Sequence, residues 1–301
     1  MEELKRPSIL EANSLYFILG VLLLFLGSYV QSREIYSGLL ITEYIIILIP
    51  NLIFLKAKKL PIKTFLRLNK INFKQIIYIA LIMVFSYPIA VFLNTIMITI
   101  LNFFGETVAS SVPIPDSGEK YLISLFVIGL SPGLCEEIMF RGTIMRAYEG
   151  MGKKKAIIYS SILFGIFHLN LQNLIGPIFL GFILAKITYK TNSIYGSILG
   201  HSLSNTIAMT LGFWANKYLA SVENSVVGYD IPYKTQMLIT LIWFGVMALI
   251  SSLALRKLLK NLPSNEVHIE GFKENIRFTD FIPVLLVFVL FIVVNVKYLF
   301  V

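Results

Sequence analysis

Two neighbouring carboxylates stand inside an apolar stretch of the sequence, where ionisable side chains are costly. The stretch reads SPGLCEEIMFRG and contains Glu136, Glu137 and Arg141. A charged side chain at the centre of a membrane costs at least about 2.5–3.5 kcal/mol on insertion scales, so these residues are candidates for function. Glu137 and Arg141 are four residues apart with the acid first, which favours an ion pair on a helix. That pairing leaves Glu136 for chemistry, although the two glutamates could exchange roles.

Two histidines occupy similar apolar stretches further along the chain. His168 follows Phe164 by four residues in FGIFHLN, and Asn205 follows His201 by four residues in GHSLSN, so each pair lies on one face of a helix. Either pair alone is equally typical of structural hydrogen bonding between membrane helices. Counted at about 1.5 Å per residue from the basic loops, Glu136 and both histidines lie roughly 10–18 Å deep and could meet in one cavity.

The combination of these side chains predicts a specific chemistry. A carboxylate and an imidazole together can orient and deprotonate a water molecule. A second imidazole and an amide can donate hydrogen bonds to a developing oxyanion. This set of groups is what hydrolysis of a peptide bond requires.

Composition indicates that membrane-spanning helices position these residues. Of the 301 residues, 56% are hydrophobic and 14% are charged, whereas soluble domains have about 25% charged residues. The predicted fold class is all-α, a polytopic transmembrane helical bundle of about nine spans. The sixth span is short and is expected to be either re-entrant or buried within the bundle. The nine expected spans are 14–30, 38–55, 75–101, 121–145, 156–171, 174–187, 194–213, 236–255 and 281–296.

The basic residues between the spans predict an orientation. The loop 56–74 holds seven Lys and Arg residues and no acid, and the positive-inside rule therefore places the N-terminus in the cytoplasm and the C-terminus outside. This topology accounts for the net charge of +9, so no nucleic-acid partner is expected. We expect N-terminal transmembrane helices with a basic cytoplasmic loop in 1–120, catalytic core helices in 121–213 and C-terminal transmembrane helices in 214–301.

Three motifs of the chain resemble those of a known family. EEIMFRG is similar to its EExxxR motif, FGIFH to its FxxxH motif and HSLSN to its HxxxN motif, and the three occur in the same order. The family is that of the CAAX-protease and bacteriocin-processing (CPBP, Abi) intramembrane endopeptidases. The resemblance covers residues 121–213, about a third of the chain.

The resemblance implies a role for each motif residue. Glu136 and His168 would activate water, and His201 with Asn205 would form the oxyanion hole. The supporting residues would be Glu137, Arg141 and Phe164.

The resemblance leaves the cofactor open. The family has been described both as metalloproteases and as metal-independent glutamic proteases. No H-E-x-x-H motif is present, and no cofactor is assigned, although Zn²⁺ is possible. If the enzyme depends on a metal, Glu136, His168 and His201 are the expected ligands.

The resemblance also implies partners and a location. The expected substrate is a membrane-associated protein or peptide, either of the CAAX type or a leader or pheromone peptide, met in the lipid bilayer. The frequency of Lys, Ile and Asn is typical of a prokaryotic source, so the expected location is a prokaryotic cell membrane.

Two other functions fit the same residues. Transporters and proton relays also contain series of buried Glu and His residues. The sequence shows no internal repeat of the kind common in transporters. A non-catalytic family member that acts as a scaffold or immunity protein would keep the same motifs.

Overall fold

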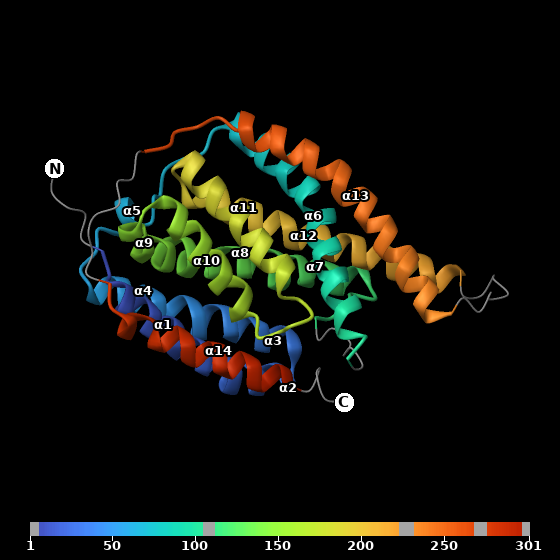
Figure 1. Ribbon diagram of the computed structural model, residues 1–301, viewed down its shortest axis with the longest axis horizontal. Coiled ribbons are helices and arrows are strands. Elements are labelled where there is room, and N and C mark those ends of the chain that lie inside the picture. Colours follow the sequence, from blue (N-terminus) through green and yellow to red (C-terminus); the bar gives the residue numbers. More distant parts are fainter. Residues whose placement is uncertain (1–5, 105–111, 223–231, 268–275, 297–301) are drawn as a thin grey trace.

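The computed structural model of the chain describes residues 6–104, 112–222, 232–267 and 276–296. Within these ranges the regular structure is helical throughout, which confirms the predicted all-α class. Figure 1 shows the main helices in three layers. One outer layer contains α1 (Ile9–Leu22), α4 (Ile49–Ala57) and α14 (Ile282–Asn295), and the opposite one contains α6 (Phe73–Leu101) and α13 (Tyr233–Asn261). The middle layer contains α8 (Ser131–Glu137), α10 (Lys153–Phe167), α11 (Ile175–Thr191) and α12 (Ile194–Val222).

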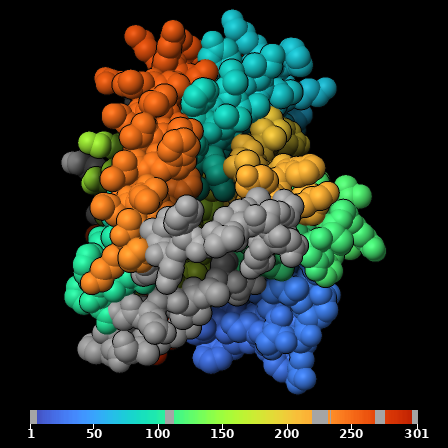
Figure 2. Space-filling view, turned by 90° about the vertical axis from the view of Figure 1, so that its right-hand side faces the viewer, coloured from blue at the N-terminus to red at the C-terminus, as the bar shows by residue number. Residues whose placement is uncertain are grey.

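Helical runs in the described residues are long and apolar enough for six membrane spans, which indicates an integral membrane protein. Figure 2 shows two of these runs, α6 and α13, side by side along one edge of the molecule, with apolar side chains of both exposed. A helix that exposes apolar side chains along its length suits contact with lipid. The six runs are Ile9–Arg33, Ile35–Ala57, Phe73–Leu101, Gly118–Met151, Lys234–Asn261 and Phe278–Asn295.

Several of these runs are built from consecutive segments of different helical type. The first consists of α1, a π-helical segment Leu23–Gly27 and α2 (Ser28–Arg33). The second consists of α3 (Ile35–Leu40), a π-helical segment Ile41–Leu48 and α4, and a short α5 (Ile62–Phe65) follows it. The fourth run contains α7 (Gly118–Ser124), a π-helical segment Leu125–Leu130, α8, a π-helical segment Ile138–Ile144, α9 (Met145–Tyr148) and a 3-10 turn Glu149–Met151. A 3-10 turn Phe278–Phe281 precedes α14.

The structure differs from the predicted nine spans at the fifth, sixth and seventh. α10 and α11 have only 15 and 17 residues, which is short for a membrane span. α12 is long enough, but its polar residues make it less apolar than the six runs. All three lie in the middle layer, where they pack against protein on both sides (Figure 1). Hydropathy alone does not distinguish a helix that faces lipid from one that faces other helices. The predicted orientation stays a prediction, because the six runs are recognised by their length and apolar composition alone.

A buried ionic cluster ties three parts of the chain together at one end of the middle layer. Glu149 is completely buried and accepts hydrogen bonds from Arg67 Nη2 at 2.6 Å, Arg146 Nη1 at 2.6 Å and the Tyr189 hydroxyl at 3.0 Å. Arg6 Nη1 lies 3.5 Å from the same carboxylate. The cluster joins the N-terminal segment and the basic loop to the helices of the middle layer.

Candidate active site

The acidic pair lies on α8, between the two π-helical segments of the run Gly118–Met151. π-helical turns inside longer helices are frequent at functional sites. Gly133 of α8 faces α12 so closely that an added Cβ would lie 2.2 Å from Ser202 Oγ and 2.9 Å from Ser202 N. Small residues allow such a close approach of helix backbones in membranes. The approach sets the acids of α8 directly beside the imidazole of α12.

Glu137 is held by Arg141, as the spacing predicts. Arg141 Nη1 donates to Glu137 Oε1 at 2.8 Å, and both side chains are completely buried. Arg141 Nη2 donates to the carbonyl of Gly181 on α11 at 2.9 Å. Through Arg141, on the π-helical segment Ile138–Ile144, the ion pair therefore links α8 to α11, which occupies Glu137 with a structural contact.

His201 lies between the two carboxylates. Its Nδ1 is 3.0 Å from Glu137 Oε1, and its Nε2 is 4.0 Å from Glu136 Oε2. Oε2 of both glutamates lacks a hydrogen-bond partner, but the Glu136 side chain keeps 11% exposure whereas that of Glu137 has none. Glu136 is therefore the member of the pair that a water molecule can reach.

The ring of Phe164 lies between the two imidazoles. Its centroid is 5.0 Å from that of His168 and 5.5 Å from that of His201, and both contacts are edge-to-face. The guanidinium carbon of Arg141 lies 4.7 Å from the same centroid. Phe164 therefore fixes the separation of the two histidines and also contacts the buried ion pair.

His168 follows the last residue of α10. Its Nδ1 lies 2.8 Å from the carbonyl oxygen of Phe164. Since a carbonyl only accepts hydrogen bonds, Nδ1 carries a hydrogen and Nε2 can accept one in the neutral ring. In the part of the chain that the structure describes, no ion pair joins His168 to a carboxylate.

Asn205 lies one helical turn beyond His201 on α12. Its Nδ2 donates to the carbonyl of Ile128 at 3.0 Å, which uses one of the two amide hydrogens. The structure therefore joins six of the seven predicted residues through contacts between their side chains, and places Asn205 at the edge of the group. The six are Glu136, Glu137, Arg141, Phe164, His168 and His201.

Comparison with protein families finds a match over residues 118–207 to the family described as Type II CAAX prenyl endopeptidase Rce1-like. The chain contains an Rce1-like domain. All seven predicted site residues lie within the matched range, which confirms the resemblance given by the three motifs. Comparisons with curated proteins and with solved structures find no match.

A third carboxylate approaches the Rce1-like domain from the second span. Glu43 lies in the π-helical segment Ile41–Leu48, which packs against α8, and it interacts electrostatically with Glu136. Its side chain is buried, and its Oε2 has no hydrogen-bond partner. The sequence interpretation missed this residue. The sequence feature that could have identified Glu43 is its position as a single acid within the apolar stretch 38–55.

The zinc ligand set suggested by the sequence does not assemble in the Rce1-like domain. Among the described residues, no group of three His, Cys, Asp or Glu side chains could hold a metal ion. The contacts of His168 are with Phe164, whose carbonyl oxygen lies 2.8 Å from Nδ1 and whose ring centroid lies 5.0 Å from that of the imidazole. We therefore derive no catalytic step through a metal.

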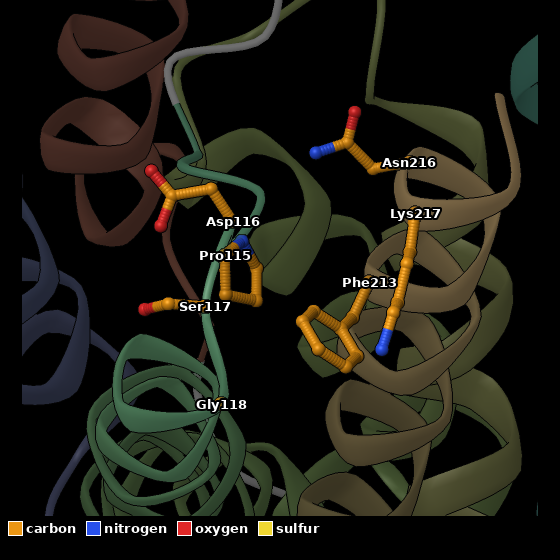
Figure 3. Close-up of a pocket in the computed structure, with 7 residues that line it drawn as sticks. All are labelled: Pro115, Asp116, Ser117, Gly118, Phe213, Asn216 and Lys217. Atoms are coloured by element: carbon orange, nitrogen blue, oxygen red, sulfur yellow. The ribbon is translucent and has the colours of Figure 1, made fainter. Parts of the chain in front are cut away.

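A cavity of about 440 Å³ lies at the far end of α12, beyond the Rce1-like domain. Figure 3 shows Asp116 and Ser117 on one side of it and Phe213, Asn216 and Lys217 on the other. None of the seven predicted site residues lines this cavity, so it is distinct from the candidate active site.

Proposed function

We propose that the protein is an intramembrane endopeptidase that hydrolyses a peptide bond in a membrane-associated protein or peptide. The observation that carries the proposal is the 4.0 Å separation between Glu136 Oε2 and His201 Nε2. This separation is too long for a direct hydrogen bond and sets the carboxylate and the imidazole beside one reacting centre. A carboxylate that takes a proton from water and an imidazole that donates to the oxyanion are groups that peptide hydrolysis uses.

The partners of the two Nδ1 atoms favour different roles for the histidines. Nδ1 of His201 faces the Glu137 carboxylate, which can balance a ring that donates through both nitrogens to an oxyanion. Nδ1 of His168 faces the uncharged carbonyl of Phe164, and its Nε2 can accept a hydrogen bond from water. We therefore assign His201 to the oxyanion and His168 to the attacking water.

The proposed reaction needs no group beyond these side chains and water. Glu136 takes one proton from the water molecule, and His168 Nε2 accepts a hydrogen bond from its other O–H group. The resulting hydroxide oxygen bonds to the carbonyl carbon. The carbonyl oxygen becomes an oxyanion that accepts hydrogen bonds from His201 Nε2–H and the free amide hydrogen of Asn205. Glu136 then returns its proton to the amide nitrogen as the C–N bond breaks. The products are a carboxylic acid and an amine.

The remaining motif residues position the reacting groups. Glu137 orients His201, Arg141 holds Glu137, and Phe164 spaces the two imidazoles. The proposed substrate is a CAAX-type protein or a leader or pheromone peptide at the membrane, and the description of the matched family favours the CAAX type.

The test compares the wild type with Glu136→Gln, which keeps the side-chain shape and removes the base. Both are reconstituted in proteoliposomes with two quenched-fluorescence peptides of one CAAX-ending sequence, one farnesylated and one unmodified. Glu136→Gln is expected to lower the cleavage rate by at least about 100-fold. Glu119→Gln is the matched control, since this exposed acid lies in the first turn of α7, and it should keep the wild-type rate.

Peptidomics of membranes from cells that produce each variant extends the test to unknown substrates. Wild type and Glu119→Gln should yield the same cleavage products, which Glu136→Gln should lack. Equal rates for Glu136→Gln and wild type, or identical peptidomes for all variants, would contradict the proposal.

A further inference from the structure

A cavity lined mainly by cations lies where three helix ends meet. It has a volume of about 330 Å³ and is formed by the start of α10 and the last turns of α11 and α13. Five basic side chains and one acidic side chain line it, which leaves an excess of four positive charges. These six residues are Lys153, Lys186, Lys190, Arg256, Lys260 and Glu266.

Two of the cations are engaged in contacts that build the cavity wall. Lys190 Nζ donates to the carbonyl of Leu259 at 2.6 Å and to that of Lys260 at 3.0 Å, near the end of α13. A cation suits the C-terminus of a helix because it opposes the negative end of the helix dipole. Lys153 forms an ion pair with Glu266, which uses the only acidic side chain of the lining.

The other three cations remain without a carboxylate. Within the described ranges, Lys186, Arg256 and Lys260 form no ion pair. Lys186 is also repelled by the charges of Lys153 and Lys190. Like charges gathered around one partly enclosed space are stabilised by an anion within it, and a phosphate group would accept hydrogen bonds from several of them.

The outer face of α13 continues from the cavity as an apolar surface. Leu249 and Leu253 are 67% and 70% exposed, and they precede Arg256 and Lys260 at spacings that keep all four on one face of the helix. The two cations lie at the end of the apolar run Lys234–Asn261, and the end of a span is where lipid headgroups are expected. Exposed leucines that lead to a cationic cavity match the chemistry of a phospholipid.

We propose that this cavity binds the phosphate of an anionic phospholipid headgroup, with the acyl chains along Leu249 and Leu253. Basic pockets between membrane helices bind such headgroups in other proteins. Free phosphate would use the same cations, but it would gain nothing from the apolar face. The inference is independent of the proposed endopeptidase activity, because none of the catalytic candidates lines this cavity.

The test measures binding of fluorescent short-chain phosphatidylglycerol and phosphatidylcholine to the full chain in detergent micelles. The wild type should bind phosphatidylglycerol at least about tenfold more tightly than phosphatidylcholine. Each basic side chain near an anionic headgroup contributes roughly fivefold, so Lys186→Gln with Arg256→Gln should weaken phosphatidylglycerol binding roughly 25-fold. Lys257→Gln is the matched control, because this exposed lysine neighbours Arg256 on α13 but does not line the cavity.

Inorganic phosphate as a competitor distinguishes the two possible sources of the phosphate group. For a lipid site, Leu253→Ser should weaken phosphatidylglycerol binding and leave competition by phosphate unchanged. Phosphate that binds as tightly as the lipid, together with no effect of Leu253→Ser, would overturn the lipid assignment. An equal loss in Lys257→Gln would overturn the site itself. Arg256→Gln alone, at an exposed position, repeats the test with an expected fivefold loss and an unchanged melting temperature.

Discussion

Nδ1 of His201 lies 3.0 Å from Oε1 of Glu137, and the same oxygen accepts a hydrogen bond from Arg141 at 2.8 Å. One carboxylate therefore links α8 to α12 and also compensates a completely buried guanidinium. This explains the division of the acidic pair, since Glu137 is fully buried in these two contacts while the Glu136 side chain keeps 11% exposure. The contact of Glu137 with Arg141 is expected to affect stability, and its contact with His201 is expected to affect activity.

Glu137→Gln is expected to lower the free energy of unfolding by about 3 kcal/mol, because it leaves the charge of Arg141 buried without compensation. Replacement of the whole pair, in Glu137→Leu with Arg141→Met, should recover most of that stability, since no buried charge remains. Cleavage should stay low in both variants because Nδ1 of His201 has lost its carboxylate partner. Thermal unfolding in detergent and peptide cleavage measure the two effects. Recovery of cleavage in the double variant would show that His201 needs no partner.

Gly133→Ala is expected to separate α8 from α12, because the added Cβ would lie 2.9 Å from the backbone nitrogen of Ser202. A shift of about 1 Å at the reacting groups costs roughly 100-fold in rate, so cleavage should fall by about this factor. Gly118→Ala is the matched control, since an added Cβ there meets no atom within 4 Å. A wild-type rate for Gly133→Ala would show that the contact between these helices does not set the geometry of the site.

The positions of the helices were predictable from the sequence, whereas the surface that each helix faces was not. The expected span 281–296 nearly coincides with α14 (Ile282–Asn295), because lipid-facing residues make the whole segment apolar. The stretches 156–171, 174–187 and 194–213 also form helices, but they pack against protein and are shorter or more polar. Which surface a helix faces depends on segments distant in the chain.

The same distinction holds for the site. The ion pair between Glu137 and Arg141 follows from a spacing of four residues, which is a local property of a helix. The contact of Glu137 with His201 spans 64 residues, and it results from the packing of α8 on α12. Glu43 was missed for this reason, since its closeness to Glu136 depends on how the second span packs against α8.

Glu149→Gln is expected to destabilise the protein by about 3–5 kcal/mol, because it leaves the guanidinium groups of Arg6, Arg67 and Arg146 around a neutral side chain. Arg67→Gln should cost less, about 1–3 kcal/mol, because the carboxylate keeps the other two cations. Thermal unfolding in detergent measures both, with Glu119→Gln as the exposed control. A smaller loss for Glu149→Gln than for Arg67→Gln would contradict the view that one carboxylate holds the cluster together.

Glu43→Gln is expected to leave stability unchanged or to raise it by about 1 kcal/mol, unlike the other buried acids. Glu43 has an oxygen without a hydrogen-bond partner and interacts with Glu136, so its charge is opposed rather than compensated. Melting temperatures of the variant and the wild type in detergent measure the difference between them. A loss of stability would mean that Glu43 is held by a cation, and that its role resembles that of Glu137 rather than that of Glu136.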